Sequence, residues 1–312
     1  MFELLHNPRW IDSRLYLQSR LEDLQPSIFD EINAGLRRLR GSGVPLISVV
    51  IPALDEEATI LRTLHSLSQN QTVIPTEVIV VNNNSTDRTQ EVLDRLEVRS
   101  FFQSKPGWGP ARQMGQEQAQ GKYILMADAD CFYPPRWIDK MAEELQKDGV
   151  TCVYGGYAFL SEPGERRWKY FFYESLRKVL TGIREYRRPW YNSVGMCMGY
   201  VRELGLKVGF IDRKIRGEDG RMAYELAQLG RIVRVRSREV VVWTFPRTLQ
   251  RDGGLLNSLF HRTLIEIARF RKYFKTQPAH DTHTSQNTEV PTFSLFRRSR
   301  PAAAQGEDAL DK

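Results

Sequence analysis

The sequence predicts an α/β fold in which helices flank a mostly parallel sheet. Short apolar runs of strand length alternate with segments whose apolar residues repeat at helical spacing, from about residue 46 to residue 157. Such alternation favours parallel strands joined by right-handed crossovers. The chain has 312 residues, of which 41% are hydrophobic and 11% aromatic, enough to bury a sizeable core.

The expected elements follow in chain order. Residues 11–40 carry apolar residues at helical spacing before a glycine-rich break at 41–43, which predicts one or two helices and a short hinge. Strands and helices then alternate: a strand at 46–51, a helix at 56–68, a strand at 78–81, a helix at 86–96, a strand at 98–102, a helix at 110–120 and a strand at 123–127. Pro134 and Pro135 start a further helix that continues to Leu145, and a strand is expected at 151–157.

The rest of the chain divides into three parts. From about Ser161 the sequence is less regular and more aromatic, which suits a substrate-facing half. Leu255–Phe274 has the pattern of a basic amphipathic helix, which either lies on anionic lipid or braces the domain. We therefore expect helical N- and C-terminal extensions at 1–44 and 251–277 around a domain at 45–250, and a disordered polar tail at 278–312.

The charge limits the classes of partner. The formal net charge is +7, which is compatible with phosphorylated small molecules, anionic lipid and nucleic acid. The excess lies between Arg221 and Lys275, where twelve Lys or Arg stand against four Asp or Glu. No motif of a nucleic-acid-binding protein accompanies it, so nucleic acid is not expected as a partner.

The cysteines and the first residues indicate a compartment. Cys131, Cys152 and Cys197 are odd in number and widely spaced, with no C-x-x-C and no histidine at metal-ligand spacing, so neither a disulfide framework nor a zinc site is expected. The start of the chain lacks the features of a signal peptide, and no stretch reaches the roughly 18 apolar residues of a membrane span. We expect a cytoplasmic protein, with a peripheral place at the inner face of the membrane as the alternative.

Asp128 and Asp130 are the most informative residues of the chain. They follow the apolar run Tyr123–Ala127, so a strand there would place both carboxylates at the edge where open α/β sheets bind ligands. Paired carboxylates suit a hard divalent cation that keeps open positions for phosphate oxygens. An isolated D-x-D is more often a solvated loop, so the surrounding motifs decide the interpretation.

Several motifs stand in order around this pair. They are SVVIPALDEE at 48–57, VIVVNNNSTD at 78–87, GPARQMG at 109–115, GKYILMADAD at 121–130 and RGED at 216–219. Together, from about Pro45 to Trp243, they resemble the family 2 glycosyltransferases, which have the GT-A fold of the nucleotide-diphospho-sugar transferases. The resemblance implies an enzyme that moves a sugar from a nucleoside diphosphate sugar to an acceptor hydroxyl.

The resemblance also assigns a nucleotide pocket. Pro52, Leu54 and Glu56 would line the base and ribose, although Glu56 would equally favour the start of a helix. Asn82 and Asn83 stand where the family commonly has an aspartate that accepts a hydrogen bond from the base. An asparagine offers a carbonyl acceptor but also a donor and no charge, so the base is less determined. For the following Asn84 and Ser85, a polar turn that caps the next helix is the alternative.

The diphosphate and the metal are assigned in the same way. Arg112 would bind the diphosphate through its guanidinium, with a solvated surface arginine as the alternative, and Lys105 is a weaker phosphate candidate. Asp128 would contact the ribose and the metal, and Asp130 would coordinate Mg²⁺ or Mn²⁺ bound to both phosphates. A UDP-sugar is the expected donor.

The acidic pair Glu218 and Asp219 is the expected catalytic pair. By resemblance Asp219 is the general base that takes the acceptor's proton, and Glu218 beside it would raise its proton affinity. Direct attack with a single base implies inversion at the anomeric carbon. The alternative is a helix N-terminus that merely favours acidic residues.

The acceptor side is less specific. Trp190–Met198 and Trp168–Tyr173 are aromatic and would pack on a sugar or lipid acceptor, or else belong to the core. The Q-x-x-R-W signature and the late histidine of many relatives are missing, which argues against a processive polysaccharide synthase. Arg247 and His261 are weak substitutes.

Three other classes of protein are alternatives to this function. A non-catalytic module that binds a nucleotide sugar or a membrane surface is the main alternative, supported by the asparagines and the missing histidine. A phosphohydrolase of the haloacid dehalogenase type also has D-x-D at a strand end, but normally near the start of its domain. A Rossmann dehydrogenase is disfavoured because no G-x-G-x-x-G follows the first strand.

Overall fold

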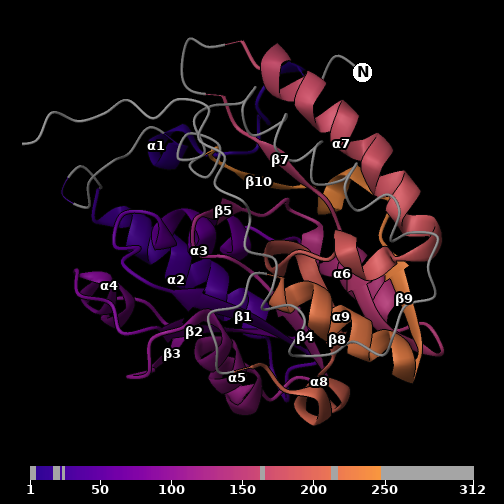
Figure 1. Cartoon of the computed structure of the whole chain (residues 1–312). Coiled ribbons are helices and arrows are strands. Elements are labelled where there is room, and N and C mark those ends of the chain that lie inside the picture. Colours follow the sequence, from indigo (N-terminus) through magenta and orange to yellow (C-terminus); the bar gives the residue numbers. More distant parts are fainter. Residues whose placement is uncertain (1–4, 17–21, 23–24, 162–165, 212–216, 247–312) are drawn as a thin grey trace, which may run out of the picture.

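The structure, a computed structural model, describes residues 5–16, 22, 25–161, 166–211 and 217–246 (Figure 1). The helices of these residues are α1 (Ser13–Tyr16), α2 (Ser27–Arg40), α3 (Ile60–Ser68), α4 (Thr89–Asp94), α5 (Trp108–Gln118), α6 (Trp137–Leu145), α7 (Trp168–Arg187), α8 (Arg202–Val208) and α9 (Glu218–Leu229), with short 3-10 turns η3 (Pro189–Asn192), η4 (Gly195–Cys197) and η5 (Arg238–Val240). The strands are β1 (Ile47–Ala53), β2 (Thr76–Asn82), β3 (Arg99–Phe102), β4 (Tyr123–Met126), β5 (Cys131–Phe132), β6 (Val150–Tyr154), β7 (Tyr157–Phe159), β8 (Met198–Val201), β9 (Arg231–Arg234) and β10 (Val242–Thr244).

Seven strands form the main sheet, in the order β3-β2-β1-β4-β8-β6-β9. Strands β3, β2, β1 and β4 are parallel to one another, and β9 is parallel to β6. Strand β8 is antiparallel to both of its neighbours, β4 and β6. A small second sheet has the order β5-β10-β7. The expectation of a mostly parallel α/β sheet is therefore confirmed, with one inserted antiparallel strand.

Helices cover both faces of the main sheet because its central strands are apolar on both sides. Val49 and Ile51 of β1 belong to a core cluster that also contains buried residues of α2, α3 and α6. Val50, between them, belongs to a second cluster with residues of α5 and α9. Successive side chains of a strand point to opposite faces, so the run Ile47–Ala53 is buried along its whole length.

The structure departs from the expected elements after residue 150. The single strand expected at 151–157 is two strands, β6 and β7, which belong to different sheets. Gly155 lies between them, where a side-chain Cβ would lie 2.4 Å from the Cys197 sulfur. The stretch expected to be irregular contains α7, a helix of 20 residues. Strand β8 also lies in this region and has only four residues, too few to show a period in the sequence.

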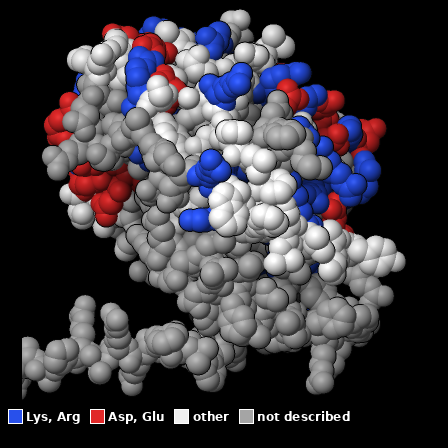
Figure 2. All heavy atoms as spheres, turned by 90° about the horizontal axis from the view of Figure 1, so that it is seen from above, with Lys and Arg blue, Asp and Glu red and all other residues white. Residues whose placement is uncertain are grey.

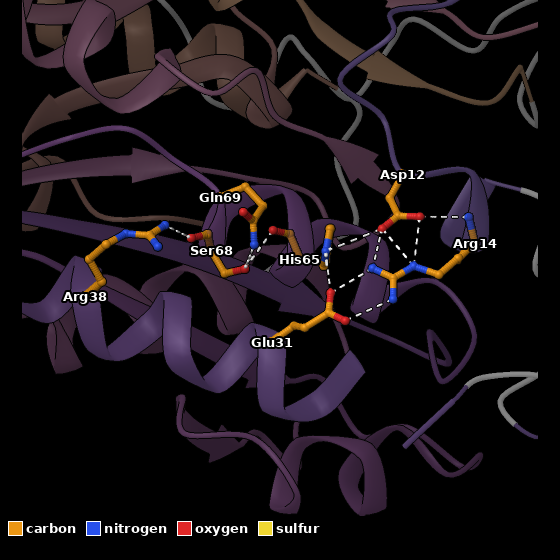
Figure 3. Close-up of polar contacts among 7 residues, drawn as sticks. All are labelled: Asp12, Arg14, Glu31, Arg38, His65, Ser68 and Gln69. Atoms are coloured by element: carbon orange, nitrogen blue, oxygen red, sulfur yellow. Dashed lines mark hydrogen bonds and ion pairs between the residues drawn. The ribbon is translucent and has the colours of Figure 1, made fainter. Parts of the chain in front are cut away.

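The N-terminal helices pack on the body of the fold. Helix α2 buries its apolar face in the same core cluster as α3 and the sheet. Arg14 donates to both Asp12 and Glu31, and His65 Nε2 of α3 lies 3.7 Å from an oxygen of each carboxylate (Figure 3). Further along the same helices, Arg38 donates to the Ser68 carbonyl at 2.6 Å. We call the first group, Asp12, Arg14, Glu31 and His65, the N-terminal charge cluster.

Several expected features lie outside the described residues. These include the amphipathic segment Leu255–Phe274, the tail at 278–312 and the candidates Arg247 and His261. Among the helices that are described, none is long and apolar enough to cross a membrane. The three cysteines are unpaired and buried.

Candidate active site

The expected site residues gather where the parallel strands end. Ala53 of β1 is in register with Asn82 of β2, and Val50 of β1 with Met126 of β4, so the loops that follow these strands leave the sheet at one edge. Because β8 is antiparallel, Met198 at its start pairs with Met126 and brings the preceding backbone to the same edge. The sheet therefore assembles residues from four separate chain segments at the position where α/β sheets bind ligands.

The turn that carries Asp128 and Asp130 is held by two buried side chains. The Tyr133 hydroxyl accepts a hydrogen bond from the Asp128 backbone N–H at 2.8 Å and donates to the Met196 carbonyl. Thr63 of α3 accepts from the Cys131 N–H at 3.0 Å and donates to the carbonyl of Cys131. Both supports were missed from the sequence, since nothing local marks Thr63 or Tyr133 as a partner of this turn.

The carboxylates of this turn form a group that fits a hard cation. Single ligand atoms of Asp128, Asp130 and Cys131 all lie within 4.8 Å of one another. Burial raises the pKa of Cys131 well above its ordinary value, with the Asp130 charge adding to the effect, so Cys131 is a neutral thiol. Oxygen ligands without a thiolate suit Mg²⁺ or Mn²⁺ rather than a soft metal.

The negative charge of the Asp128 carboxylate is not fully compensated by nearby positive charge. Burial raises its pKa to about 7; Arg112 opposes the shift and Asp130 adds to it. The nearest guanidinium nitrogen of Arg112 is 3.8 Å from the carboxylate, beyond hydrogen-bond distance. A cation at this position would favour the charged form of Asp128 and displace its proton. The donor set and its charge therefore fit a divalent metal.

Arg112 joins the two acidic parts of the site. It lies in α5, is 8% exposed, and its Nη1 is 2.5 Å from an oxygen of Asp219 in α9. Burial by itself would lower the pKa of Arg112, but Asp219 and Asp128 outweigh it and the pKa is raised. The buried Nε of Arg112 has no hydrogen-bond partner. The guanidinium of Arg112 therefore stays charged, and its Nε–H is available to donate a hydrogen bond to a ligand.

Asp219 is held on its other side by the backbone. Its second oxygen accepts from the Gly195 N–H at 2.8 Å. A Cβ at Gly195 would lie 2.2 Å from Arg112 Nη2 and 3.0 Å from Asp219, so only glycine permits this close approach. The pairing of Arg112 with Asp219 was not anticipated from the sequence, which assigned these residues to different steps.

Glu218 contacts the backbone of the segment before α9. It is 6% exposed, and its carboxylate accepts from the Ile211 N–H at 2.7 Å. Burial raises its pKa, and the Ile211 hydrogen bond opposes the shift. In the structure Glu218 fixes the chain before α9, and a catalytic role for it stays a prediction.

Hydrogen bonds connect the loops that follow β1 and β2. The Asp55 carboxylate accepts from the Thr86 N–H at 2.7 Å, and the Asp55 N–H donates to the Ser85 hydroxyl at 3.0 Å. Asp55 and Asn84 have positive φ angles of 53° and 60°, as tight turns require. These contacts shape the segment that holds Pro52, Leu54 and Glu56, of which Leu54 and Glu56 are partly exposed and Pro52 is buried within β1.

Asn82 and Asn83 differ in whether a hydrogen-bonding group of the side-chain amide lacks a partner. Asn82 accepts from the Ser85 N–H and donates to Gln90, so both ends of its amide are engaged. The Asn83 carbonyl accepts from the Gly107 N–H at 3.0 Å, while its buried Nδ2 has no partner. The sequence suggested a hydrogen-bond acceptor at this position, whereas in the structure the group of Asn83 that has no partner is its Nδ2 donor.

The aromatic residues of the expected acceptor side divide into core and surface. Tyr173 is buried and its ring lies 5.8 Å from that of Phe159, whereas Trp168 and Phe172 are half or more exposed. Trp190 packs on Tyr224 of α9 with 5.1 Å between ring centroids. The indole N–H of Trp190 and the Ser193 hydroxyl are buried without a hydrogen-bond partner. Lys105, the weaker phosphate candidate, is exposed.

The fold and the site together define a glycosyltransferase of the GT-A type. The model of the family described as "Glycosyl transferase family 2" matches residues 48–206, about half of the chain. The chain belongs to this family, and the resemblance inferred from the sequence motifs is confirmed.

Individual relatives are similar over a shorter part of the chain. An "Uncharacterized glycosyltransferase" of Haemophilus influenzae is 29% identical over 129 residues, which are 39% of this chain and 51% of that protein. A "Hyaluronan synthase" of Pasteurella multocida is 37% identical over 117 residues, 36% of this chain and 12% of that protein. The chain thus matches about half or less of the length of these curated relatives.

A solved structure supports the fold independently. The mannosyltransferase PcManGT of Pyrobaculum calidifontis, in complex with GDP-Man and Mn²⁺, has a TM-score of 0.51 and 18% sequence identity. The similarity covers 69% of this chain and 62% of that chain. At this identity the likeness establishes the shared architecture.

Proposed function

We propose that this glycosyltransferase moves a sugar from a nucleoside diphosphate sugar to an acceptor hydroxyl with inversion at the anomeric carbon. The observation that carries the proposal is the convergence of Arg112, Asp128, Asp130 and Asp219 at one edge of the sheet, with Arg112 paired to Asp219 and facing Asp128. Carboxylates for a metal, a cation for phosphate and a base for the acceptor are the groups that such a transfer needs.

The donor would lie across the loops after β1 and β2. Pro52, Leu54 and Glu56 would contact the base and ribose, and the free Nδ2 of Asn83 would donate to a carbonyl oxygen of the base. A UDP-sugar is the donor that we propose first. GDP sugars belong in the same test, because the structurally similar mannosyltransferase binds GDP-Man.

Asp128 and Asp130 would hold Mg²⁺ or Mn²⁺ together with the donor's diphosphate. Such an ion would offset the charge that develops on the departing nucleoside diphosphate. The raised pKa of Asp128 and the oxygen ligands support this role, as does the Mn²⁺ present in the structurally similar mannosyltransferase.

Arg112 would change partner when the donor binds. Its guanidinium contacts Asp219 and has an unused, buried Nε, so a diphosphate near Asp128 would compete with Asp219 for the same donors. In the structure one oxygen of Asp219 contacts Arg112 and the other accepts from the Gly195 N–H. Transfer of Arg112 toward phosphate would therefore leave Asp219, still held by Gly195, free to accept the acceptor's proton.

The acceptor would approach from η3 and α9. The buried indole N–H of Trp190 and the Ser193 hydroxyl lack partners, and Ser193 lies two residues from Gly195, which contacts Asp219. Unpaired buried polar groups are costly unless a ligand or water satisfies them. These groups therefore suit the hydroxyls of a sugar acceptor beside the proposed base.

A nucleotide-sugar binding module without turnover is the alternative function. The Arg112–Asp219 ion pair is the observation that favours it, because it occupies the proposed base. Turnover with any donor and acceptor pair would exclude this alternative.

The proposal is tested first by binding. Isothermal titration calorimetry with UDP and with GDP, in Mn²⁺ and in EDTA, should show binding that depends on the metal. Asp130→Asn should abolish that dependence, because it removes a coordinating charge with little change of shape. Asp148→Asn, at an exposed aspartate before β6, is the matched control and should bind as the wild type does. Unchanged metal-dependent affinity in Asp130→Asn would refute the metal assignment.

A further inference from the structure

Helix α7 presents a continuous apolar stripe to solvent. Its members recur at intervals of three or four residues along one face, and each is between 40% and 86% exposed. They are Trp168, Phe172, Leu176, Val179, Ile183 and Tyr186. At about 100° per residue the six directions fall within about 80° of one another, and they run along a helix of roughly 30 Å. Figure 1 shows α7 on the outside of the molecule.

The opposite face of α7 fixes the helix to the body. Arg177 donates to the Tyr157 carbonyl of β7, and its guanidinium lies 3.6 Å from the centre of the Tyr157 ring. Glu174 is buried, accepts from the Phe159 N–H at 2.8 Å and pairs with the buried Arg167. Rotating the helix to bury the stripe would break these buried bonds, so the stripe faces outward in the folded protein.

Within α7, exposed lysines flank the stripe, and neither glutamate of the helix does. Lys169 and Lys178 are exposed, and by the helical rotation they lie on opposite sides of the stripe, about 20° and about 80° outside its edges. The two acids of α7 are engaged elsewhere: Glu174 is buried, and Glu185 accepts from both Arg234 and Arg236 at 2.8 Å. On the face seen from above, Lys and Arg lie beside uncharged side chains, and Asp and Glu lie mainly toward its edges (Figure 2).

We propose that α7 docks flat on an anionic membrane surface. A narrow apolar stripe bordered by lysines is the arrangement of an interfacial helix, whose apolar side chains enter the boundary between headgroups and acyl chains. The lysine stems cover apolar surface while their ammonium groups reach anionic headgroups. This inference concerns a surface on α7 and stands whether or not the proposed transfer reaction is correct.

Charge argues against two protein occupants of the stripe. A second copy of the chain, packed stripe to stripe, would bring the lysine borders of both helices together. The amphipathic segment Leu255–Phe274 of this chain is also basic, with Arg262, Arg269, Arg271 and Lys272 against Glu266. Like charges that face each other destabilise an interface, whereas an anionic lipid surface complements both sets.

The first experiment measures binding of the full chain to vesicles by co-sedimentation. We expect binding to phosphatidylcholine vesicles that contain about 30% phosphatidylglycerol, and none to pure phosphatidylcholine. Binding should weaken as salt is raised from about 50 mM to about 500 mM, because the lysine contribution is screened. Absence of binding to the anionic vesicles at low salt would overturn the proposal.

Variants then locate the contact. Phe172→Asp and Val179→Asp place a charge in the stripe and should each lower the partition coefficient about tenfold or more. Val73→Asp is the matched control, since Val73 is 99% exposed on a loop far along the chain from α7, and it should bind as the wild type does. Circular dichroism melting of each variant checks that the fold is intact.

Direct contact is measured with brominated lipid, which quenches a tryptophan that enters the acyl region. Vesicles should quench part of the wild-type emission, and Trp168→Phe should lose that part. Undiminished vesicle binding by Phe172→Asp and Val179→Asp would assign the contact to Leu255–Phe274 and refute our assignment. A dimer in light scattering that Val179→Asp dissociates, without vesicle binding by the wild type, would instead identify a second copy as the occupant.

Discussion

Two clusters of charged side chains in this molecule have similar composition and different electrostatics. The N-terminal charge cluster and the active-site group each contain an arginine between two carboxylates. In the first, Arg14 reaches both Asp12 and Glu31 at 2.7 Å, and its hydrogen bonds lower the pKa of each. At the sheet edge Arg112 contacts Asp219 but stays 3.8 Å from Asp128, whose pKa is raised to about 7.

We propose that this difference separates a structural cluster from a ligand-binding site. Ligand atoms of Asp12, Glu31 and His65 lie close enough together to hold a metal, yet the guanidinium of Arg14 already supplies the positive charge there. At the sheet edge the negative charge of Asp128 is only partly compensated by positive charge, and the Nε of Arg112 has no hydrogen-bond partner. We infer that incomplete pairing of charges, rather than the presence of acidic residues, distinguishes the proposed ligand site from the N-terminal charge cluster.

The largest expected effect concerns Asp219. Asp219→Asn removes the proposed base and keeps the side-chain size, so turnover should fall by about 10²- to 10⁴-fold while donor affinity changes little. Steady-state kinetics and calorimetry with the same donor measure the two quantities. A near wild-type rate would place the base elsewhere, and loss of donor binding together with a lower Tm would make Asp219 structural.

The two arginines should respond differently to the same substitution. Arg112→Lys keeps the charge but loses the fork of donors, so donor affinity should fall about 10- to 100-fold. Arg14→Lys should leave donor affinity unchanged and lower the Tm by a few degrees, since its pairs are partly exposed. Equal effects of the two variants on donor affinity would contradict the distinction between the clusters.

The pH dependence of Asp128 should have the sign of a raised pKa. Its folded-state pKa of about 7 lies above the ordinary 3.8, so the folded state binds the extra proton, and this contribution to stability is lost as pH rises through about 7. Asp128→Asn removes the titrating carboxyl group, so the variant does not lose this stability as pH rises. The Tm of the variant minus that of the wild type should therefore be greater at pH 8 than at pH 5, by about 3 °C or more.

A bound divalent metal should reverse this pH dependence of the Tm difference between Asp128→Asn and the wild type. Mn²⁺ with a nucleoside diphosphate should raise the wild-type Tm more at pH 8 than at pH 5, because metal and proton compete for Asp128. The Tm of Asp128→Asn should respond less to the same addition. A pH-independent difference between the two proteins, measured without metal by differential scanning fluorimetry, would show that Asp128 is not protonated in the folded state.

The smallest effect is expected from His65. Burial lowers its pKa, while Asp12 and Glu31 oppose the shift. With a folded pKa below the ordinary 6.5, its contribution to stability is present above pH 6.5 and lost as pH falls through the folded pKa, because the unfolded chain takes up the proton more readily. His65→Gln should flatten the Tm profile below pH 6.5 by a degree or two. A profile that keeps the wild-type shape would exclude His65 as the titrating group.

Much of the fold was predictable because its signals are local. The apolar runs of β1 and β2 and the helical spacing of α3 and α6 appear in short windows, and the D-x-D position follows from the end of β4. Other elements carried weak local signals. Strand β8 has four residues, and the stripe of α7 was obscured by the aromatic residues around it.

The sequence by itself determined the alternation of strands and helices, the family, and the placing of Asp128 and Asp130 at a strand end. Only the tertiary structure decided which charges meet. Arg112 and Asp219 are 107 residues apart and pair directly, and the Gly195 N–H reaches Asp219 because β8 runs antiparallel beside β4. Hydrophobic periodicity acts over a few residues, whereas the pairing of charges depends on distances that exist only after the sheet has formed.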